Sequence, residues 1–242
     1  MTTLPPLAVL HADTHIAVVD KPAGVLAHES RLAARETDTL LARARAVLGE
    51  QAWLAHRLDR ATSGCLLLGR ERALMAVLGA GFMERQVDKR YLAIVRGWPD
   101  PEGCIDHPLD GGPGKPARRD ARTRYRTLAS AELPLPIPPH QSARYALLEC
   151  APETGRYRQI RRHLKHIDHH LIGDTSHGDG RHNRAFRQHL GVHRMLLHAW
   201  QLTFTHPITG ERIHTTAPLD PEFRKALTHL AIPDPTLPTT PL

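Results

Sequence analysis

Short apolar runs separated by turn residues are the main pattern along this chain, and they predict strands. A pair of runs flanks the turn residues Pro207-Ile208-Thr209-Gly210 and predicts a hairpin. A proline-rich stretch, Leu133 to Pro139, cannot join a central sheet and is expected at an exposed hairpin tip or in an insertion. The predicted strands lie at 9–10, 16–19, 65–68, 90–96, 121–128, 145–150, 196–204 and 212–216.

Helical spacing is found in fewer segments. Residues 38–48 predict a helix with Asp38 as its N-cap and Gly49 as its stop. Residues 72–85 predict a second helix, and Asp220-Pro221 open a last one that reaches residue 230. Strands and helices mix without β-α-β alternation, so the expected class is α+β, with a mixed, largely antiparallel sheet flanked by helices.

One domain, spanning residues 5–230, accommodates these elements, since a chain of 242 residues is long enough to bury a single large core. The proline-broken segment 231–242 is expected to be a disordered tail.

Composition narrows the class of protein. No apolar stretch is long enough to span a membrane, and the N-terminus lacks the pattern of a secretory signal. Three separated cysteines without C-x-x-C spacing suit reduced thiols, which favours a cytoplasmic protein. The net charge of +7 favours a polyanion partner, although a biased genome also produces arginine-rich chains.

The segment His56 to Gly64 carries the strongest chemical signal. Asp59 stands between Arg57 and Arg60, and the turn residues Thr62 to Gly64 separate it from an apolar strand that begins at Cys65. Neighbouring positive charge favours the carboxylate anion, which can then act as a nucleophile or a base. A loop salt bridge is the alternative for so short a pattern.

The full string HRLDRATSG resembles the HRLDRxTSG signature of the RluA-type pseudouridine synthases. Three more segments resemble elements of that family in the same order. They are Asp20 to Gly24 with His28, Lys89-Arg90-Tyr91 with the strand that follows, and Thr154 to His163, which matches TGRxHQIRxH except that Arg158 replaces a histidine. The resemblance runs from about Val9 to Phe204 and implies the pseudouridine synthase fold with a central RNA-binding cleft.

The resemblance also implies a role for each site residue. Asp59 would be the nucleophile that starts cleavage of the glycosidic bond of a flipped uridine, and Arg161 would pair with it. Tyr91 would stack on the base and take part in proton transfer, Ile160 would pack on its other side, and Arg57 would fill the vacated space. No metal or cofactor is implied. Without the resemblance, Tyr91 and Ile160 read as core residues and Arg57 as a phosphate contact.

The segment after Gly155 predicts a helix with an apolar stripe, and Arg161 lies at the edge of that stripe. A more exposed flank of cations suits RNA phosphates, or is simply a solvated face. The stripe consists of Tyr157, Ile160, Leu164 and Ile167, and the flank of Arg158, Arg162 and Lys165.

The region 172–199 resembles the branch of the family that modifies uridine-65 in the T-stem of tRNA. Arg60, Arg181, Arg184 and Arg187 are further candidate RNA contacts. The expected partner is therefore tRNA, with ribosomal RNA as the alternative. No protein partner is implied, and a monomer is the default expectation.

Two functions from other classes of protein are alternatives to a pseudouridine synthase. His166 and His170 have the spacing of a helical zinc site, which suggests a metal-dependent hydrolase, but no H-E-x-x-H is present and the segment is strongly basic. A non-catalytic RNA-binding module is the second, although a carboxylate facing phosphates would weaken its affinity.

Overall fold

The structure is a computed structural model that describes residues 7–28 and 38–236. The chain forms two compact units. The first consists of Met1–Lys89 and Ala199–Ala217, and the second of Arg90–His198 and Pro218–Leu242. The chain enters each of these units more than once, and the single domain over residues 5–230 stays a prediction.

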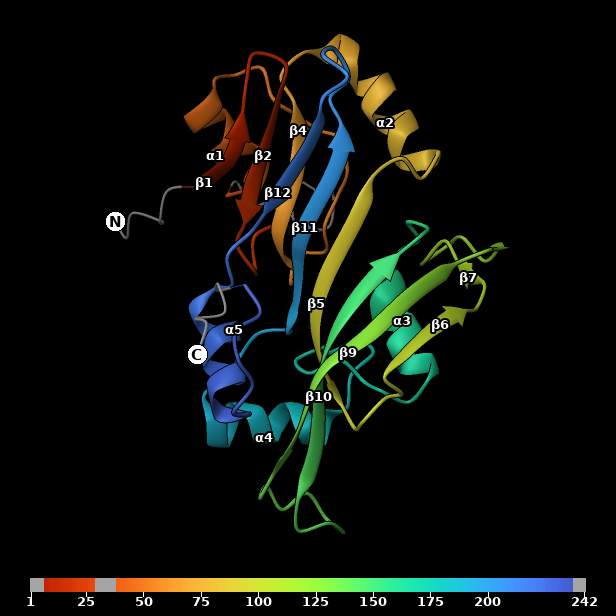
Figure 1. Ribbon diagram of the computed structural model, residues 1–242, viewed down its shortest axis with the longest axis vertical. Coiled ribbons are helices and arrows are strands. Elements are labelled where there is room, and N and C mark those ends of the chain that lie inside the picture. Colours follow the sequence, from red (N-terminus) through yellow and green to blue (C-terminus); the bar gives the residue numbers. More distant parts are fainter. Residues whose placement is uncertain (1–6, 29–37, 237–242) are drawn as a thin grey trace. The chain divides into compact units, whose positions relative to one another are not determined.

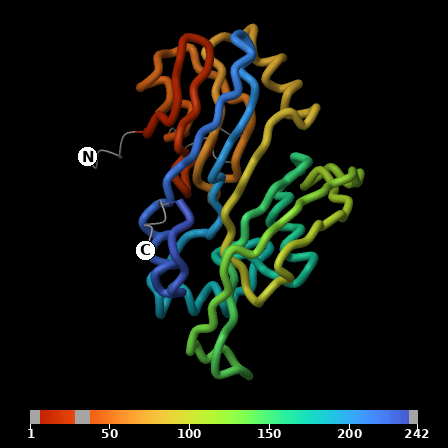
Figure 2. Tube along the Cα trace, in the orientation of Figure 1, coloured from red at the N-terminus to blue at the C-terminus, as the bar shows by residue number. Residues whose placement is uncertain are grey.

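The first unit is built on antiparallel strands from both ends of the sequence. Strands β1 (Ala8–Ala12), β2 (Ile16–Lys21) and β4 (Ser63–Gly69) are neighbours, followed by β11 (Leu197–Thr205) and β12 (Arg212–Thr216). The short β3 (Trp53–Leu54) pairs with β4. Figure 2 shows the early strands, in red, beside β11 and β12, in blue. The predicted hairpin of β11 and β12 is confirmed.

Strands β2 and β4 form the centre of this unit because both of their faces are covered. Every residue of β4 is buried, which explains why it reads as a continuous apolar run. Its core residues pack with those of β11, β12 and α2 (Met75–Met83). This core consists of Ile16, Val18, Cys65, Leu67, Leu74, Leu78, Val87, Leu202, Phe204, Ile213 and Ala217.

The helices of the first unit differ in detail from those expected. Helix α1 is Leu40–Leu48, and its N-cap is Thr39, whose side chain accepts from the Ala42 N–H; Asp38 instead pairs with Arg43. The Asp38 carboxylate and the Thr39 hydroxyl are both suitable N-caps. Because Asp38 forms an ion pair with Arg43, the Thr39 hydroxyl caps the helix. The predicted helix over 72–85 is a 3₁₀ turn, η2 (Arg72–Leu74), followed by α2.

The second unit contains a four-stranded antiparallel arrangement in the order β5, β10, β9, β6. Helix α3 (Gln159–His166) lies behind β9 and β10 (Figure 1). A small hairpin of β7 (Leu109–Asp110) and β8 (Arg118–Arg119) precedes β9. The strands are β5 (Asp88–Arg96), β6 (Glu102–Asp106), β9 (Arg122–Leu133) and β10 (Ala143–Pro152).

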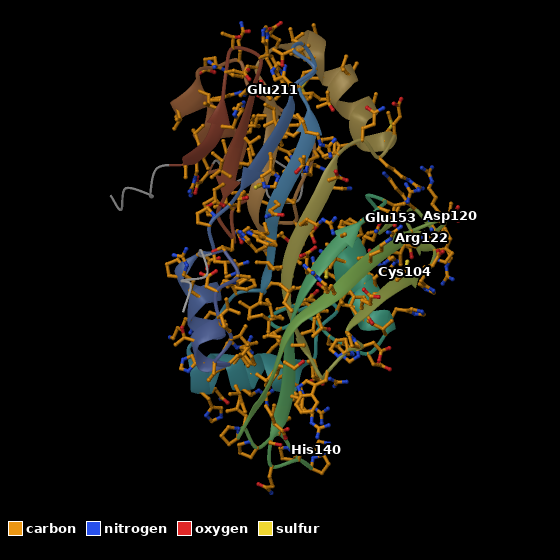
Figure 3. The ribbon with its side chains drawn as sticks, viewed as in Figure 1. Cys104, Asp120, Arg122, His140, Glu153 and Glu211 are labelled. Carbon is orange, nitrogen blue, oxygen red and sulfur yellow. The ribbon has the colours of Figure 1, made fainter. Side chains whose placement is uncertain are left out.

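The proline-rich stretch joins β9 to β10 as expected, and Figure 3 shows His140 at its tip. At the opposite end of these strands, Arg122 lies close to Glu153 and Cys104 (Figure 3). The strands therefore form a long antiparallel ribbon with the exposed His140 at one end, while Thr123 and Thr154 are buried at the other. The expected α+β class, with a largely antiparallel sheet, is confirmed.

Helix α4 (Gly180–Leu190) was not predicted. Asp179 caps its start by accepting from the Arg181 N–H, and Gly191 ends it with a left-handed φ of 59°. The buried Tyr145 of β10 packs edge-on against Phe186 of this helix, with ring centroids 5.0 Å apart. Aromatic packing of this kind fixes α4 on the second unit.

Helix α5 (Pro221–His229) begins at the predicted Asp220 cap, which accepts from the N–H groups of Glu222 and Phe223. The chain that follows packs back on it, because Ile232 is buried and Asp234 pairs with Arg224. Residues 231–236 of the expected tail are thus part of the folded unit, and residues 237–242 lie outside the described residues.

Candidate active site

Asp59 lies on a tight turn that leads into β4. The Thr62 N–H donates to the Asp59 carbonyl at 3.0 Å, and the preceding Leu58 is buried. Asp59 itself is half-buried, whereas Arg57 and Arg60 are exposed. The turn thus places a carboxylate at the surface of the first unit with a cation on each side in sequence.

Two of the motifs found in the sequence hold each other in place here. The Gly24 N–H donates to the Arg60 carbonyl at 2.8 Å, and the Arg60 Nε donates to the Gly24 carbonyl at 2.8 Å. The KPAG segment is therefore the structural support of the Asp59 turn. The contact also uses one of the guanidinium donors of Arg60, which was expected to bind RNA.

Lys21 also supports the Asp59 turn, from the interior of the protein. Its side chain is fully buried, and its Nζ donates to the carbonyls of Pro22, Arg60 and Thr62 at 2.9, 3.0 and 2.8 Å. A buried ammonium group is tolerated only when its donors are satisfied, and three carbonyls meet that condition. Lys21 therefore fixes the backbone on both sides of the segment that carries Asp59.

His56 and Gly64, at the two ends of the motif, have structural roles. The Leu67 N–H of β4 donates to His56 Nε2 at 3.1 Å, and the His56 ring packs on Phe82. Burial, together with the Lys89 charge, lowers the pKa of His56 to about 3. Gly64 has a φ of +108°, and a Cβ there would lie 2.2 Å from the Ala199 carbonyl oxygen. Only glycine fits that position.

The second unit carries the other expected site residues. Tyr91 is partly buried on β5, opposite Cys150 of β10. Ile160 and Arg161 are both buried at the start of α3. Because Asp59 belongs to the first unit, its meeting with Tyr91 and Arg161 stays a prediction.

Within the second unit, Arg161 is held by Asp174. Its Nε and Nη2 donate to Asp174 Oδ2 and Oδ1 at 2.6 and 2.8 Å, and the Asp174 side chain is fully buried. Burial opposes ionisation of Asp174, but the Arg161 fork and the N–H groups of Ser176 and His177 outweigh it and lower its pKa. The sequence analysis did not assign this carboxylate a role.

The remaining polar residues of the Thr154–His163 element connect α3 to β9. Gln159 donates to the Arg122 carbonyl and to Thr123 Oγ1, and accepts from Thr154 Oγ1 at 2.6 Å. His163 Nδ1 lies 2.9 Å from Thr123 Oγ1. Gln159 and His163 are buried, so these contacts fix the helix that presents Ile160 and Arg161.

The predicted helical flank is only partly helical. Helix α3 begins at Gln159, so Arg158 is its N-cap residue, with a left-handed φ of 50°, and Tyr157 precedes the helix and is 37% exposed. Including Tyr157 in the apolar stripe was therefore wrong, whereas Ile160 and Leu164 are buried as expected. Arg162 pairs with Asp110 of the β7–β8 hairpin at 2.8 Å.

The candidate RNA contacts Arg181, Arg184 and Arg187 are all exposed on α4. Arg181 donates to the Pro138 carbonyl and pairs with Asp179. Arg184 and Arg187 lie further along the same helix, so the three cations follow one element rather than a loop.

The histidine pair suggested for zinc does not lie on one helix. Helix α3 ends at His166, whose ring stacks on His107, and His170 lies beyond it with its Nδ1 2.9 Å from the His177 carbonyl oxygen. Within residues 7–28 and 38–236, no group of three or more histidine, cysteine, aspartate or glutamate side chains is arranged to hold a metal ion. The i, i+4 interpretation is therefore wrong.

Comparison with known proteins identifies the class. The family described as RNA pseudouridylate synthase matches residues 15–166, and the chain belongs to this family. It is an isomerase that converts uridine to pseudouridine in RNA. None of the described helices has the length and apolar character needed to cross a bilayer.

Individual relatives are similar over most of the chain. A protein named tRNA pseudouridine synthase C from Vibrio parahaemolyticus is 38% identical over 231 residues, covering 92% of this chain and 94% of the relative. A protein of the same name from Salmonella typhimurium is 41% identical, covering 92% and 89%. The solved structure of human RNA Pseudouridylate Synthase Domain Containing 4 has a TM-score of 0.73 at 26% identity, covering 95% of each chain.

Proposed function

We propose that this protein is a tRNA pseudouridine synthase that modifies uridine-65 in the T-stem. The similarity to relatives named tRNA pseudouridine synthase C supports tRNA as the substrate. The exposed cations of α4 support contact with the RNA backbone. Cytoplasmic location and a monomeric state belong to the same proposal.

The observation that carries the proposed mechanism is the fixed turn of Asp59. Lys21 and the Gly24–Arg60 contacts hold the backbone on both sides of a half-buried carboxylate. A nucleophile that attacks a nucleotide must be positioned before the substrate arrives, because misplacement by about 1 Å can cost two orders of magnitude in rate. The fixed backbone of this turn supports that role for Asp59.

In the proposed reaction, Asp59 starts cleavage of the N1–C1′ bond of a uridine that has left the helical stack. The detached uracil stays bound and rotates, and its C5 joins C1′ while the C5 proton is released and N1 gains a proton. Uridine and pseudouridine are isomers, so atoms and electrons balance without an oxidant. Extruding the base costs a few kcal/mol, which binding of the surrounding RNA offsets.

Arg161 is proposed to pair with Asp59 when RNA is bound, and Asp174 prepares it by fixing the guanidinium. Tyr91 is proposed to stack on the base and Ile160 to pack on the other side, while Arg57 occupies the space that the uridine leaves. Each of these roles is the one that the family resemblance of its motif implies.

The substrate is tested by mapping pseudouridine in tRNA and ribosomal RNA from cells with and without the protein. We expect position 65 of tRNA to lose the modification when the protein is absent. Loss from ribosomal RNA alone would overturn the tRNA assignment and leave the reaction in place. A tritium-release assay on C5-labelled tRNA transcripts separates the enzyme from a non-catalytic RNA-binding module, which would release none.

A further inference from the structure

A cavity of about 660 Å³ opens in the second unit between the β7–β8 hairpin and the start of α3. The hairpin turn contributes Asp110, Gly112 and Lys115, and the other wall contributes Tyr157, Arg158 and Arg162, with His177 also lining the space. All of these residues belong to one compact unit. The cavity therefore does not depend on how the two units meet.

The lining carries three cations and one carboxylate. Arg162 uses that carboxylate, because its Nη2 donates to Asp110 Oδ2 and its Nη1 to the Asp110 carbonyl. Among the residues that the structure describes, neither Lys115 nor Arg158 forms an ion pair with a carboxylate. The cavity thus has an excess of positive charge, which favours an anionic occupant.

Contacts with Tyr157 and Ser176 position the Arg158 guanidinium and leave some of its N–H donors available to bind a ligand. The group lies 4.9 Å from the centroid of the Tyr157 ring, and one nitrogen, Nη1, donates to Ser176 Oγ at 3.2 Å. Stacking on an aromatic face leaves the edge of the guanidinium, with its remaining N–H donors, free to bind oxygen. Arg158 has a left-handed backbone, which is unusual outside glycine, and its side chain lines the cavity.

Gly112 shapes the opposite wall. It has a φ of +94°, and a Cβ on it would lie 2.6 Å from Tyr157 Cδ1, so the turn backbone lies directly on the ring. The Gly111 N–H donates to the Lys115 carbonyl and the Lys115 N–H to the Gly112 carbonyl, both at 2.9 Å. The turn that presents Lys115 is therefore closed by its own hydrogen bonds and fitted to the ring beneath it.

A second hollow of about 300 Å³ shares Arg162 and His177 with the first. Its other lining residues are Leu109, Lys165 and the stacked pair His107 and His166. His177 Nε2 is buried and has no hydrogen-bond partner among the described residues. Buried polar atoms are normally paired, and a nitrogen left open beside a cationic cavity is the kind of atom that a ligand satisfies.

We propose that this cavity binds one phosphate group of the RNA backbone through Lys115, Arg158 and Arg162. The inference rests on the proposed function and adds a specific contact to it. Arginine and lysine bind phosphate oxygens by charge and hydrogen bonding without reading the base, so the site would position RNA and not select its sequence. Adjacent cationic hollows suit successive phosphates of one strand better than a single free ion.

The test measures equilibrium binding of an unmodified tRNA transcript over a series of KCl concentrations. All variants carry Asp59→Asn so that no turnover occurs. We expect Arg158→Gln and Lys115→Gln each to weaken binding about tenfold at 0.1 M salt. Because both cations would hold the same phosphate, the double variant should lower the salt slope by about one in total.

The matched control is Lys225→Gln, which removes one exposed charge from α5 outside the cavity. We expect it to leave the slope and the affinity unchanged. An equal effect in this control, an unchanged slope in the double variant, or a slope reduced by about two would each overturn the single-phosphate site. Thermal unfolding of each variant confirms that the fold is retained.

A test with inorganic phosphate distinguishes an RNA phosphate group from a free phosphate ion as the occupant of the cavity. If the cavity binds free phosphate and not RNA, calorimetry will detect phosphate binding by the parent protein but not by the double variant, while both proteins bind tRNA with equal affinity, and the assignment to RNA is overturned. If pseudouridine instead maps outside position 65, the substrate proposal fails while the binding test, made on the mapped RNA, still decides the cavity.

Discussion

Arg161 and Asp174 form a buried two-point ion pair, with Nε to Oδ2 at 2.6 Å and Nη2 to Oδ1 at 2.8 Å. The geometry fixes the plane of the guanidinium, because both bonds are charge-assisted and parallel. Asp174 is itself held by the N–H groups of Ser176 and His177. Asp174 therefore orients Arg161 from within the second unit.

Replacing Asp174 should cost both stability and turnover. In Asp174→Asn the buried guanidinium loses its counter-charge, so we expect the free energy of unfolding to fall by about 3 kcal/mol. Urea unfolding measures this loss, and tritium release measures a parallel drop in turnover. Asp106→Asn is the control because Asp106 pairs with Arg122 at the surface, where the cost should stay below about 1 kcal/mol. Equal losses in the two variants would contradict a special role for Asp174.

Lys21 provides a second prediction. Lys21→Met keeps the length of the side chain but leaves the carbonyls of Pro22, Arg60 and Thr62 without their buried donor. We expect a loss of about 2 kcal/mol or more in unfolding free energy. Turnover per folded molecule should also fall, because the Asp59 turn loses its support. The exposed Lys225→Met serves as control, and full activity of folded Lys21→Met would refute the anchoring role.

His56 predicts a pH dependence of stability. Its pKa falls from an ordinary value of about 6.5 to about 3 on folding, so below pH 6.5 the unfolded chain binds a proton that the folded chain does not. Stability should therefore decrease as the pH falls from 6.5 toward 3. Because the ring is only partly buried, we expect His56 to contribute about 1 kcal/mol per pH unit at most.

The measurement compares urea unfolding of the parent and of His56→Gln between pH 7 and 5. Glutamine can still accept from the Leu67 N–H but does not titrate. We expect a shallower pH slope in this variant, while exposed His229→Gln retains the parental slope. Identical slopes in all three proteins would show that His56 does not cause the effect.

The sequence allowed the prediction of those elements whose signals are local. Strand β4, the β11–β12 hairpin and the Asp220 cap follow from apolar runs and turn residues, and the structure confirms them. Helix α4 was missed although Asp179 and Gly191 mark its two ends. A family resemblance in this segment carries no information about secondary structure, whereas the two caps do.

Residues whose roles depend on long-range contacts were harder to predict. Asp174 is a site residue only because folding brings it to Arg161, and no local pattern shows that pairing. Lys21 was recognised as part of a motif, but its burial beneath the Asp59 turn depends on residues some forty positions away. The helical spacing places Tyr157 in the apolar stripe, but the left-handed Arg158 caps the helix after it, and no local pattern predicts that conformation.

Asp59→Asn tests the central claim most directly, because it removes the nucleophilic charge while keeping the size of the side chain. Tritium release from C5-labelled tRNA transcripts measures turnover, and equilibrium binding of the same transcripts measures affinity. The account predicts that release falls to background while the dissociation constant stays within about threefold of the parent value, a difference of under 1 kcal/mol. Substantial pseudouridine formation by folded Asp59→Asn would contradict the account.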